Sequence, residues 1–307
     1  MSTAPPDRND AALPASVVIP TFNRPDRLAR CLQGLAGMRS ARADFEVVVV
    51  DDGGTRPLAD IIAGFHDRLD VRLIRQENAG PAAARNAGAA QARGSLLAFT
   101  DDDCVPDPEW LVQLLAAHRE QPDALLGGLT INALAENLLS EASQQLVAYL
   151  YDYHERTSGA PAFFTSNNMA LARALFLDAP FDTSFRLAAG EDREFCDRWL
   201  ARGRTLHRAD GAVIYHYHQL GPAAYWRQHF NYGRGAFHFH VARARRSGSV
   251  RLEPLSFYSG LLLFPLRGRA PLLRRGLVSF WLGISQAANA AGYFAEKWRE
   301  RQAAAGD

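Results

Sequence analysis

The sequence predicts an α/β fold in which βαβ units build a mostly parallel sheet with helices on both faces. Two observations carry this prediction. Short apolar runs alternate with segments in which apolar residues recur at the spacing of a helix. Several of these runs, such as residues 45–50, are apolar at nearly every position, which is typical of strands that are covered on both sides.

The apolar runs give the expected strands of the first third of the chain, at residues 16–20, 45–50, 71–74 and 95–99. Helices are expected between them: Leu28, Cys31, Leu32 and Leu35 follow helical spacing, as do residues 58–65, and residues 81–92 are rich in alanine. The second half is less regular. Its expected strands are residues 124–129 and 213–218, and residues 163–171 are expected to form a strand and a loop. Its expected helices are residues 111–115, 137–153, 191–202 and 222–239.

Composition sets limits on the class of protein. A chain of 307 residues with 48% hydrophobic content can hold one large domain and an appendage. The net charge of +1 argues against nucleic acid as a partner. Cys31, Cys104 and Cys196 are too scattered for a disulfide framework or a zinc site, so we expect a reducing, cytoplasmic setting. Residues 1–15 resemble a disordered tail and no signal peptide.

Three polar clusters follow expected strands: Asn23 with Arg24, Asp51 with Asp52, and the triplet Asp101 to Asp103. The carboxyl ends of parallel strands meet at one edge, so these clusters are expected to share one rim, where open α/β sheets bind their ligands. Three neighbouring carboxylates repel one another unless a cation lies between them. A divalent metal that also holds a diphosphate would meet this need.

Five segments then resemble the family 2 glycosyltransferases of the GT-A fold, in the order in which that family has them. They are VVIPTFNRP (17–25), VVVVDDGG (47–54), NAGPAAARNAGAAQARG (78–94), FTDDDCVPDPEWL (99–111) and GEDREFCDRWLARG (190–203). The resemblance covers about residues 16–220. It implies a GT-A domain at residues 16–240, with a nucleotide-binding half up to about residue 110 and an acceptor half after it. It also implies transfer of a sugar from a nucleotide diphosphate sugar to an acceptor hydroxyl, with inversion.

The resemblance also implies roles for individual residues. Binding of the nucleotide sugar is expected from Pro20, Thr21, Asn23, Arg24, Asp52, Arg85, Asn86, Asp101 and Asp102. Binding of Mn²⁺ or Mg²⁺ is expected from Asp103, Asp101 and His216, in which Asp101 and Asp103 form the D-x-D pair. Asp192 matches the aspartate that acts as general base. Residues considered for the acceptor side are Asn167, Asn168, Glu191 and His218.

Simpler interpretations stay open for several of these residues. Asp52 could belong to a turn with Gly53, and Glu191 and Asp192 could only stabilise a helix N-terminus. The whole chain could be a sugar-nucleotide binding protein without catalysis. An aspartate-nucleophile phosphatase is a weaker alternative, because the chain's one lysine is Lys297. The Gln-x-x-Arg-Trp signature of processive synthases is absent, which favours transfer of a single sugar in glycan or glycolipid biosynthesis.

Residues 241–307 are expected to form a helical extension that is both basic and apolar. From residue 227 to the end, the sequence contains 13 Lys/Arg and 4 Asp/Glu, and residues 277–295 carry no charge. That segment is too diluted by polar residues for a membrane span, but it suits a helix on an anionic membrane surface. The alternative is a helical pair packed on the domain or a contact in a homodimer. Three kinds of acceptor thus stay open: a glycan, a lipid-linked acceptor at the inner face of the membrane, and a small molecule.

Overall fold

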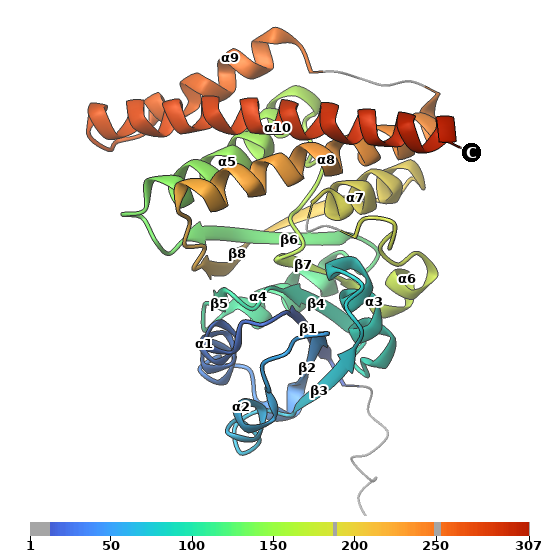
Figure 1. The fold of residues 1–307 in the computed structure, drawn as a ribbon. Coiled ribbons are helices and arrows are strands. Elements are labelled where there is room, and N and C mark those ends of the chain that lie inside the picture. Colours follow the sequence, from blue (N-terminus) through green and yellow to red (C-terminus); the bar gives the residue numbers. More distant parts are fainter. Residues whose placement is uncertain (1–12, 187–188, 249–252, 307) are drawn as a thin grey trace, which may run out of the picture.

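The computed structural model describes residues 13–186, 189–248 and 253–306, and it contains one eight-stranded sheet below a layer of long helices (Figure 1). The strands are β1 (Ala15–Thr21), β2 (Phe45–Asp52), β3 (Val71–Gln76), β4 (Leu96–Thr100), β5 (Cys104–Pro106), β6 (Leu125–Asn132), β7 (Asn168–Ala172) and β8 (Leu206–His216). The helices next to the sheet are α1 (Pro25–Ala36), α2 (Ala59–Ala63), α3 (Pro81–Gln91), α4 (Trp110–Glu120), α6 (Arg173–Asp178) and α7 (Glu191–Ala201).

The strand order is β3-β2-β1-β4-β7-β6-β8-β5. The four N-terminal strands are all parallel, as predicted from the alternation of strands and helices. In the second half β6 and β8 are parallel, whereas β7 runs antiparallel to β4 and β6, and β5 runs antiparallel to β8. The predicted α/β class is therefore confirmed, and every antiparallel pair includes a strand that follows β4 in the chain.

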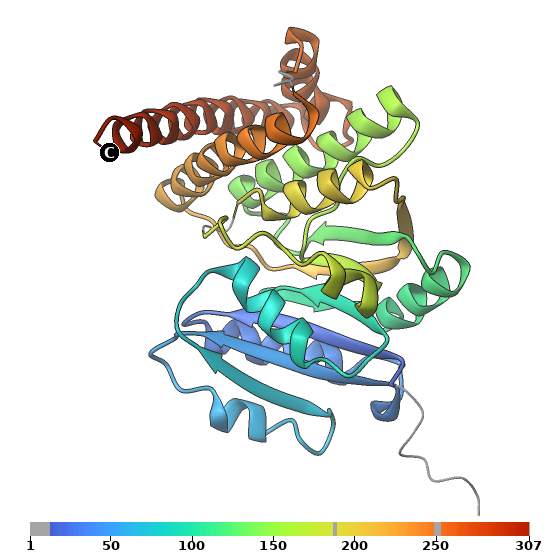
Figure 2. The ribbon, with the colours of Figure 1, turned by 90° about the vertical axis from the view of Figure 1, so that its right-hand side faces the viewer.

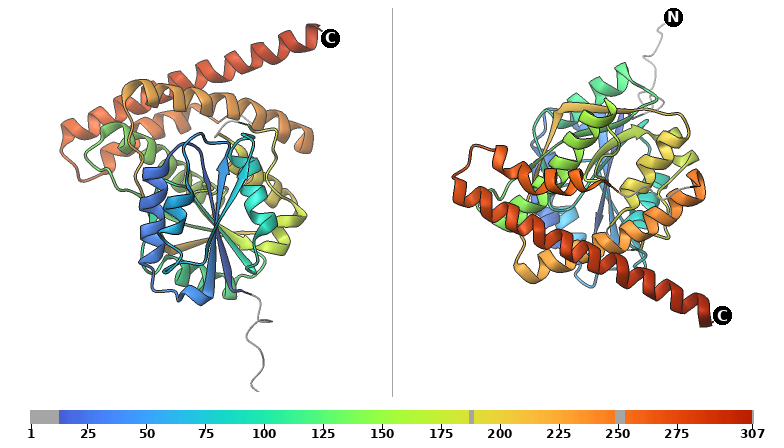
Figure 3. Two further views of the ribbon diagram at one scale, coloured as in Figure 1. Left: turned by 60° about the horizontal axis from the view of Figure 1, so that its bottom comes forward. Right: turned by 90° about the horizontal axis from the view of Figure 1, so that it is seen from above.

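Alternate residues of the central strands enter two separate cores. Val17 and Ile19 of β1 pack with α1 and α4 on one face, where Trp110 is completely buried. Val18 points to the other face, where α3, α6 and α7 pack around a group of aromatic rings that includes Phe99. Helices thus cover both faces of the sheet, and this layering explains why its strands are almost continuously apolar (Figures 2 and 3).

Some predicted bounds differ from the observed ones. The last long strand, β8, begins at Leu206 and not at residue 213, because Asp210 and Gly211 interrupt its apolar pattern. The expected domain boundary at residue 240 falls within α8 (Pro222–Ser247). Of the expected tail, residues 1–12 lie outside the described part of the chain, whereas Ala15 already belongs to β1.

The C-terminal helices form a layer over the sheet with α5 (Leu138–Ser158) and α8. They are α9 (Leu255–Leu263) and α10 (Leu272–Gly306), and their apolar contact with α5 and α8 includes Phe257, Leu261 and Leu282. Tyr149 of α5 donates a hydrogen bond to the carbonyl of Phe257 at 2.7 Å. The predicted helical extension therefore packs on the rest of the protein. None of the helices in the described part combines the length and hydropathy that a membrane crossing needs.

The crossing of α8 and α10 is held close by glycine. A Cβ atom at Gly292 would lie 1.9 Å from the carbonyl oxygen of Phe230, and one at Gly233 would lie 1.9 Å from that of Asn289. Each backbone therefore occupies the space that a side chain on the other helix would need. At the edge of the crossing, Glu296 is buried and accepts hydrogen bonds from Arg234 at 2.6 Å and His238 at 2.8 Å.

We expect Gly292→Ala to lower the free energy of unfolding by about 1–3 kcal/mol, because the added methyl group forces the two helices apart. Gly276→Ala in the same helix is the matched control, since a Cβ there meets nothing within 4 Å. That variant should gain up to about 1 kcal/mol from helix propensity. Urea unfolding measures both changes. Equal stability of the two variants would show that the crossing is looser than described.

Candidate functional site

A cavity of about 690 Å³ lies between the carboxyl ends of the sheet and the helical layer. Nine of the predicted site residues line it: Arg24, Arg85, Asp101, Asp103, Asn167, Glu191, Asp192, His216 and His218. They come from the loops after β1 and β4, from α3, from the segment before β7, from α7 and from the end of β8. The parallel register of β1 and β4 places the first two loops at the same edge, as expected.

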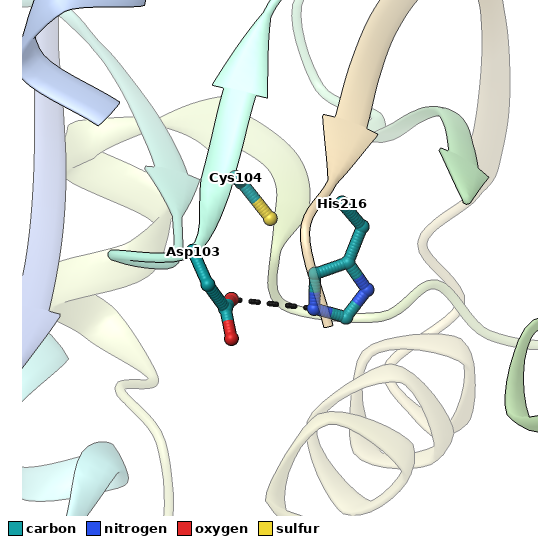
Figure 4. A group of neighbouring side chains, drawn as sticks. All are labelled: Asp103, Cys104 and His216. Carbon is teal, nitrogen blue, oxygen red and sulfur yellow. Dashed lines mark ion pairs between the residues drawn. The ribbon is translucent and has the colours of Figure 1, made fainter. Parts of the chain in front are cut away.

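Asp103 and His216 meet through the pairing of β5 with β8. Cys104 is the register partner of His216, which brings the carboxylate of Asp103 to 3.2 Å from Nε2 of His216 (Figure 4). The other carboxylate oxygen of Asp103 accepts a hydrogen bond from Arg27 at 2.8 Å. Burial alone would raise the pKa of Asp103, but the hydrogen bond and charge of His216 outweigh burial and hold that pKa well below its usual range. Asp103 is therefore ionised at neutral pH.

The chemistry of this donor set fits a divalent cation. Ligand atoms of Asp103, Cys104 and His216 lie within 4.8 Å of one another. Burial raises the pKa of the Cys104 thiol well above its ordinary value, so this sulfur stays protonated and is a poor ligand. An ionised carboxylate and an imidazole remain, and the exposed part of Asp101 lies on the same cavity wall. This set suits a hard or borderline metal such as Mn²⁺ better than a thiophilic one.

Arg85 connects two acidic motifs that lie far apart in the sequence. Its guanidinium donates to Asp101 at 2.6 Å and to Glu191 at 3.1 Å, and only 4% of its side chain is exposed. Burial disfavours the charged guanidinium, but the two carboxylates raise its pKa above the ordinary value. Arg85 is thus a fixed positive charge beneath the cavity, and it ties α7 to the end of β4.

Asp192 lies next to Glu191 at the N-terminus of α7, on the wall of the cavity. Burial raises the pKa of both carboxyl groups, and the charge of Asp192 raises that of Glu191 further. The charge of Arg85 opposes both rises, and the backbone N–H of Arg193 opposes that of Asp192. The start of α7 is held by a close contact: Gly190 has φ +89, and a Cβ there would lie 3.1 Å from the carbonyl oxygen of Gly235 in α8. A carboxylate with a raised pKa, beside a cavity, can accept a proton at neutral pH.

Asp102 does not line the cavity. Thr21 donates to it at 2.7 Å and Arg24 at 3.3 Å, and the residue is 2% exposed. Burial raises the pKa of Asp102 to about 6, although the charge of Arg24 opposes the shift. The side chains of Thr21 and Asp102 therefore fix the loop after β4 to the end of β1. Arg24 is half exposed and reaches the cavity.

Three residues expected to bind the nucleotide use their side chains to hold loops. Asp52 accepts hydrogen bonds from Gln76 and from the backbone of Ala79 and Gly80, at 2.7 to 2.9 Å. Asn23 accepts hydrogen bonds from residues 55 and 56, and Asn86 forms two hydrogen bonds with the backbone of residue 181. None of the three lines the cavity, nor does Pro20. Their binding roles stay predictions, and the positions of Asp52 and Asn23 lie at the rim after β2 and β1.

The acceptor-side candidates divide into two groups. Asn168 accepts a hydrogen bond from Trp110 at 2.9 Å and donates to the carbonyl groups of residues 129 and 212. Its side chain is therefore held inside the sheet and does not line the cavity. Asn167 and His218 do line the cavity. The ring of His218 stacks on His216 at 4.8 Å, and burial, with the neighbouring His216, lowers the pKa of His218 to about 4. His218 is therefore neutral at pH 7.

Arg27 and Tyr232 line the cavity although the sequence did not predict them as site residues. Arg27 pairs with Asp103, and its position contains a signal: a basic residue in the first turn of a helix opposes the helix dipole, which indicates a nearby carboxylate. Tyr232 lies in an aromatic stretch of α8 that is typical of helix packing, yet it lines the cavity and accepts a hydrogen bond from Gln228 at 3.0 Å. Only the path of α8 distinguishes it from its packed neighbours.

We expect Arg85→Gln to lower the free energy of unfolding by about 3–5 kcal/mol, because it leaves two carboxylates near each other without their cation. Asp101 is 31% exposed, so the loss should lie near the lower limit. Arg202→Gln is the control, since it breaks an exposed pair with Asp178 and should cost no more than about 1 kcal/mol. Denaturant unfolding measures both. Equal losses would mean that Arg85 has no special structural role.

Comparison with known proteins agrees with this geometry. The profile of "Glycosyl transferase family 2" matches residues 16–178, more than half of the chain. The chain is 46% identical to a validoxylamine A glucosyltransferase of Streptomyces hygroscopicus subsp. jinggangensis over 105 residues. The matched segment covers 34% of this chain and 25% of that protein. It is 30% identical over 235 residues to a hyaluronan synthase of Pasteurella multocida, covering 66% of this chain and 24% of the synthase.

The chain thus spans about a quarter of the length of these curated relatives. Among solved structures, it is similar to the mannosyltransferase PcManGT of Pyrobaculum calidifontis in complex with GDP-Man and Mn²⁺. The TM-score is 0.65 and the identity 19%, over 93% of this chain and 87% of the other. That likeness shows a GT-A fold. The ordered motifs, the sheet and the matched profile together show that the chain belongs to glycosyltransferase family 2.

Proposed function

We propose that this protein is a metal-dependent, inverting glycosyltransferase that moves one sugar from a nucleotide diphosphate sugar to an acceptor hydroxyl, in glycan or glycolipid biosynthesis. One observation carries the proposal: the ionised Asp103 with its partner His216, and the carboxylate of Asp192, line the same cavity in a member of this family. The first pair suits a metal and the second group suits a base.

Asp103 and His216, with Asp101 on the same wall, would hold the cation. When bound there, Mn²⁺ or Mg²⁺ would neutralise the negative charge that develops on the leaving diphosphate. The guanidinium groups of Arg24 and Arg27 are part of the cavity wall and add positive charge for the phosphate oxygens. The carboxylate of Asp192 takes the proton of the acceptor hydroxyl as that oxygen attacks the anomeric carbon. Arg85 holds Glu191, and thereby the start of α7, in place.

The donor and the acceptor are not identified by these residues. The Pyrobaculum mannosyltransferase is in complex with GDP-Man, and a similar Staphylococcus aureus TarS structure contains UDP-GlcNAc, so donors with either base are suitable for a first screen. A thermal-shift screen of sugar nucleotides with Mn²⁺ or Mg²⁺ would identify the donor by its stabilisation of the fold. The absence of the Gln-x-x-Arg-Trp signature supports single transfer.

Two alternatives lead to different results. A binding protein without catalysis would be stabilised by a donor but would release no nucleoside diphosphate from it, whether acceptor or water is available. An aspartate-nucleophile phosphatase is not supported, because the chain belongs to a glycosyltransferase family and Asp101 is engaged by Arg85. The lysine that such a phosphatase needs is missing as well, since Lys297 belongs to α10.

We expect Asp103→Asn to abolish metal-dependent binding of the donor, because the amide is neutral and a weaker ligand than the carboxylate. Isothermal titration of the donor with and without Mn²⁺ measures this loss. Asp123→Asn changes an exposed aspartate outside the cavity and serves as control. Unchanged metal-dependent binding by the Asp103 variant would exclude the metal assignment.

We expect Asp192→Asn to lower kcat by about 10²–10⁴-fold while the donor Kd hardly changes. Because the pKa of Asp192 is raised by burial, the rate of the native protein should fall as the pH drops through a value above the ordinary 3.8 of aspartate. This acidic limb should be missing from the residual rate of the variant. Asp197→Asn, on the same helix but paired with Arg246, is the control. A collapse of donor affinity with normal turnover of bound donor would assign Asp192 to binding.

A further inference from the structure

The outer side of α10 carries a long apolar stripe whose members are exposed in the described part of the chain, except for Ile284, which is partly buried against the helical layer. Its members recur at alternating steps of four and three residues: Leu273, Leu277, Phe280, Ile284, Ala287, Ala291, Phe294 and Trp298. At 100° per residue these positions fall within an arc of about 100° along the whole helix. Leu273 is 78% exposed, Phe280 58% and Trp298 64%. The opposite side, with Leu282 and Gly292, is the one that packs on α8 and α5.

Exposed leucines of α9 continue this surface. Leu255, Leu262 and Leu263 are exposed on α9, and Leu266 follows directly after it. A Cβ atom at Gly283 of α10 would lie 3.9 Å from the side chain of Leu262, so the two helices present one connected surface. The views from the front and from above show α9 and α10 side by side in the layer farthest from the sheet (Figures 1 and 3). We name this the α9–α10 surface.

Basic groups outnumber acidic ones around the α9–α10 surface. Residues 254–295 contain four arginines, namely Arg267, Arg269, Arg274 and Arg275, and no aspartate or glutamate. Arg267 and Arg269 are exposed. Arg274 forms an ion pair at 3.3 Å with Glu136, which lies outside this segment. The far end of α10 carries Lys297, Arg299 and Arg301 against Glu296 and Glu300. The end of the stripe near residue 273 is thus basic, the end near residue 298 has one more basic than acidic group, and the middle of the stripe is neutral.

We propose that the α9–α10 surface docks on an anionic membrane, with α10 lying in the plane of the interface. A continuous apolar stripe with exposed Phe and Trp side chains suits the boundary between headgroups and acyl chains, and flanking arginines suit anionic headgroups. A second copy of the chain fits less well. Two α10 stripes packed in parallel would bring arginine against arginine. An antiparallel pair would bring Arg274 and Arg275 toward an end of α10 where three basic groups outnumber two acidic ones, and one of these, Glu296, is already buried and paired with Arg234.

The cavity gives this docking a consequence for the acceptor. Phe257 and Tyr258 of α9 belong to the lining of the same cavity that contains Asp103 and Asp192. Docking through α9 would therefore bring one end of the cavity next to the bilayer, where it could receive an acceptor carried by a lipid. This consequence rests on the proposed glycosyl transfer, whereas the docking itself does not depend on it.

Sedimentation with lipid vesicles tests the docking without any measure of activity. The full chain is mixed with vesicles of phosphatidylcholine alone or of phosphatidylcholine with phosphatidylglycerol. We expect binding to the mixed vesicles only, and we expect it to weaken as salt screens the arginines. Leu273→Gln with Leu277→Gln and Phe280→Gln should weaken binding at least tenfold, because buried apolar area is lost. Arg267→Gln with Arg269→Gln should weaken it about fivefold per arginine.

Matched controls change exposed residues elsewhere. Leu177→Gln with Leu200→Gln alters exposed leucines of α6 and α7, and Arg42→Gln with Arg119→Gln removes two exposed arginines. Both controls should bind as the native chain does. The proposal is overturned if the native chain binds neither type of vesicle, or if the apolar triple variant binds as strongly as the native chain. It is also overturned if sedimentation equilibrium shows a dimer that the triple variant dissociates, because the stripe would then be an interface between two copies.

Discussion

The position of α7 relative to the sheet depends on the ion pairs that Arg85 forms with Asp101 and Glu191. These three groups come from α3, from the end of β4 and from the start of α7, so one guanidinium holds together segments that are 16 and 106 residues away from it in the sequence. Charges removed from water are stable only when they are paired and hydrogen-bonded. Burial of this triad therefore allows little movement of α7 relative to the parallel half of the sheet. Asp192, next to Glu191, has its position over the cavity fixed by the same constraint.

The helical layer supports the site from the other side. Gly235 of α8 lies against Ala189 and Gly190, directly before the two acidic residues of α7, and α8 is in turn held by its close crossing with α10. A continuous chain of backbone contacts thus runs from the C-terminal helix to the start of α7. This arrangement gives the C-terminal helices two sides with separate tasks: one side positions the cavity wall, and the other is the exposed α9–α10 surface.

The sequence identified where polar groups gather but not what each group does there. Asp101 and Asp103 line the cavity because strands β1 and β4 are parallel, and that rule can be applied from the sequence alone. Asp52 and Asn86 also follow the family pattern, yet their side chains are hydrogen-bonded to nearby loops. An aspartate at the end of a strand or an asparagine on a helix can bind a ligand or hold a neighbouring loop, and the residue type is the same in both cases. Only the positions of neighbouring backbone amides distinguish them.

By itself, the sequence determined the alternation of strands and helices, the rim of acidic clusters and the family, because these follow from local periodicity and from motifs that are continuous in the chain. The tertiary structure alone decided which carboxylate pairs with Arg27 and that Asn168 is inside the sheet. It also decided which side of α10 is exposed, since this helix has apolar residues on both sides. Such choices depend on contacts between segments that lie far apart in the chain, which no local pattern in the sequence encodes.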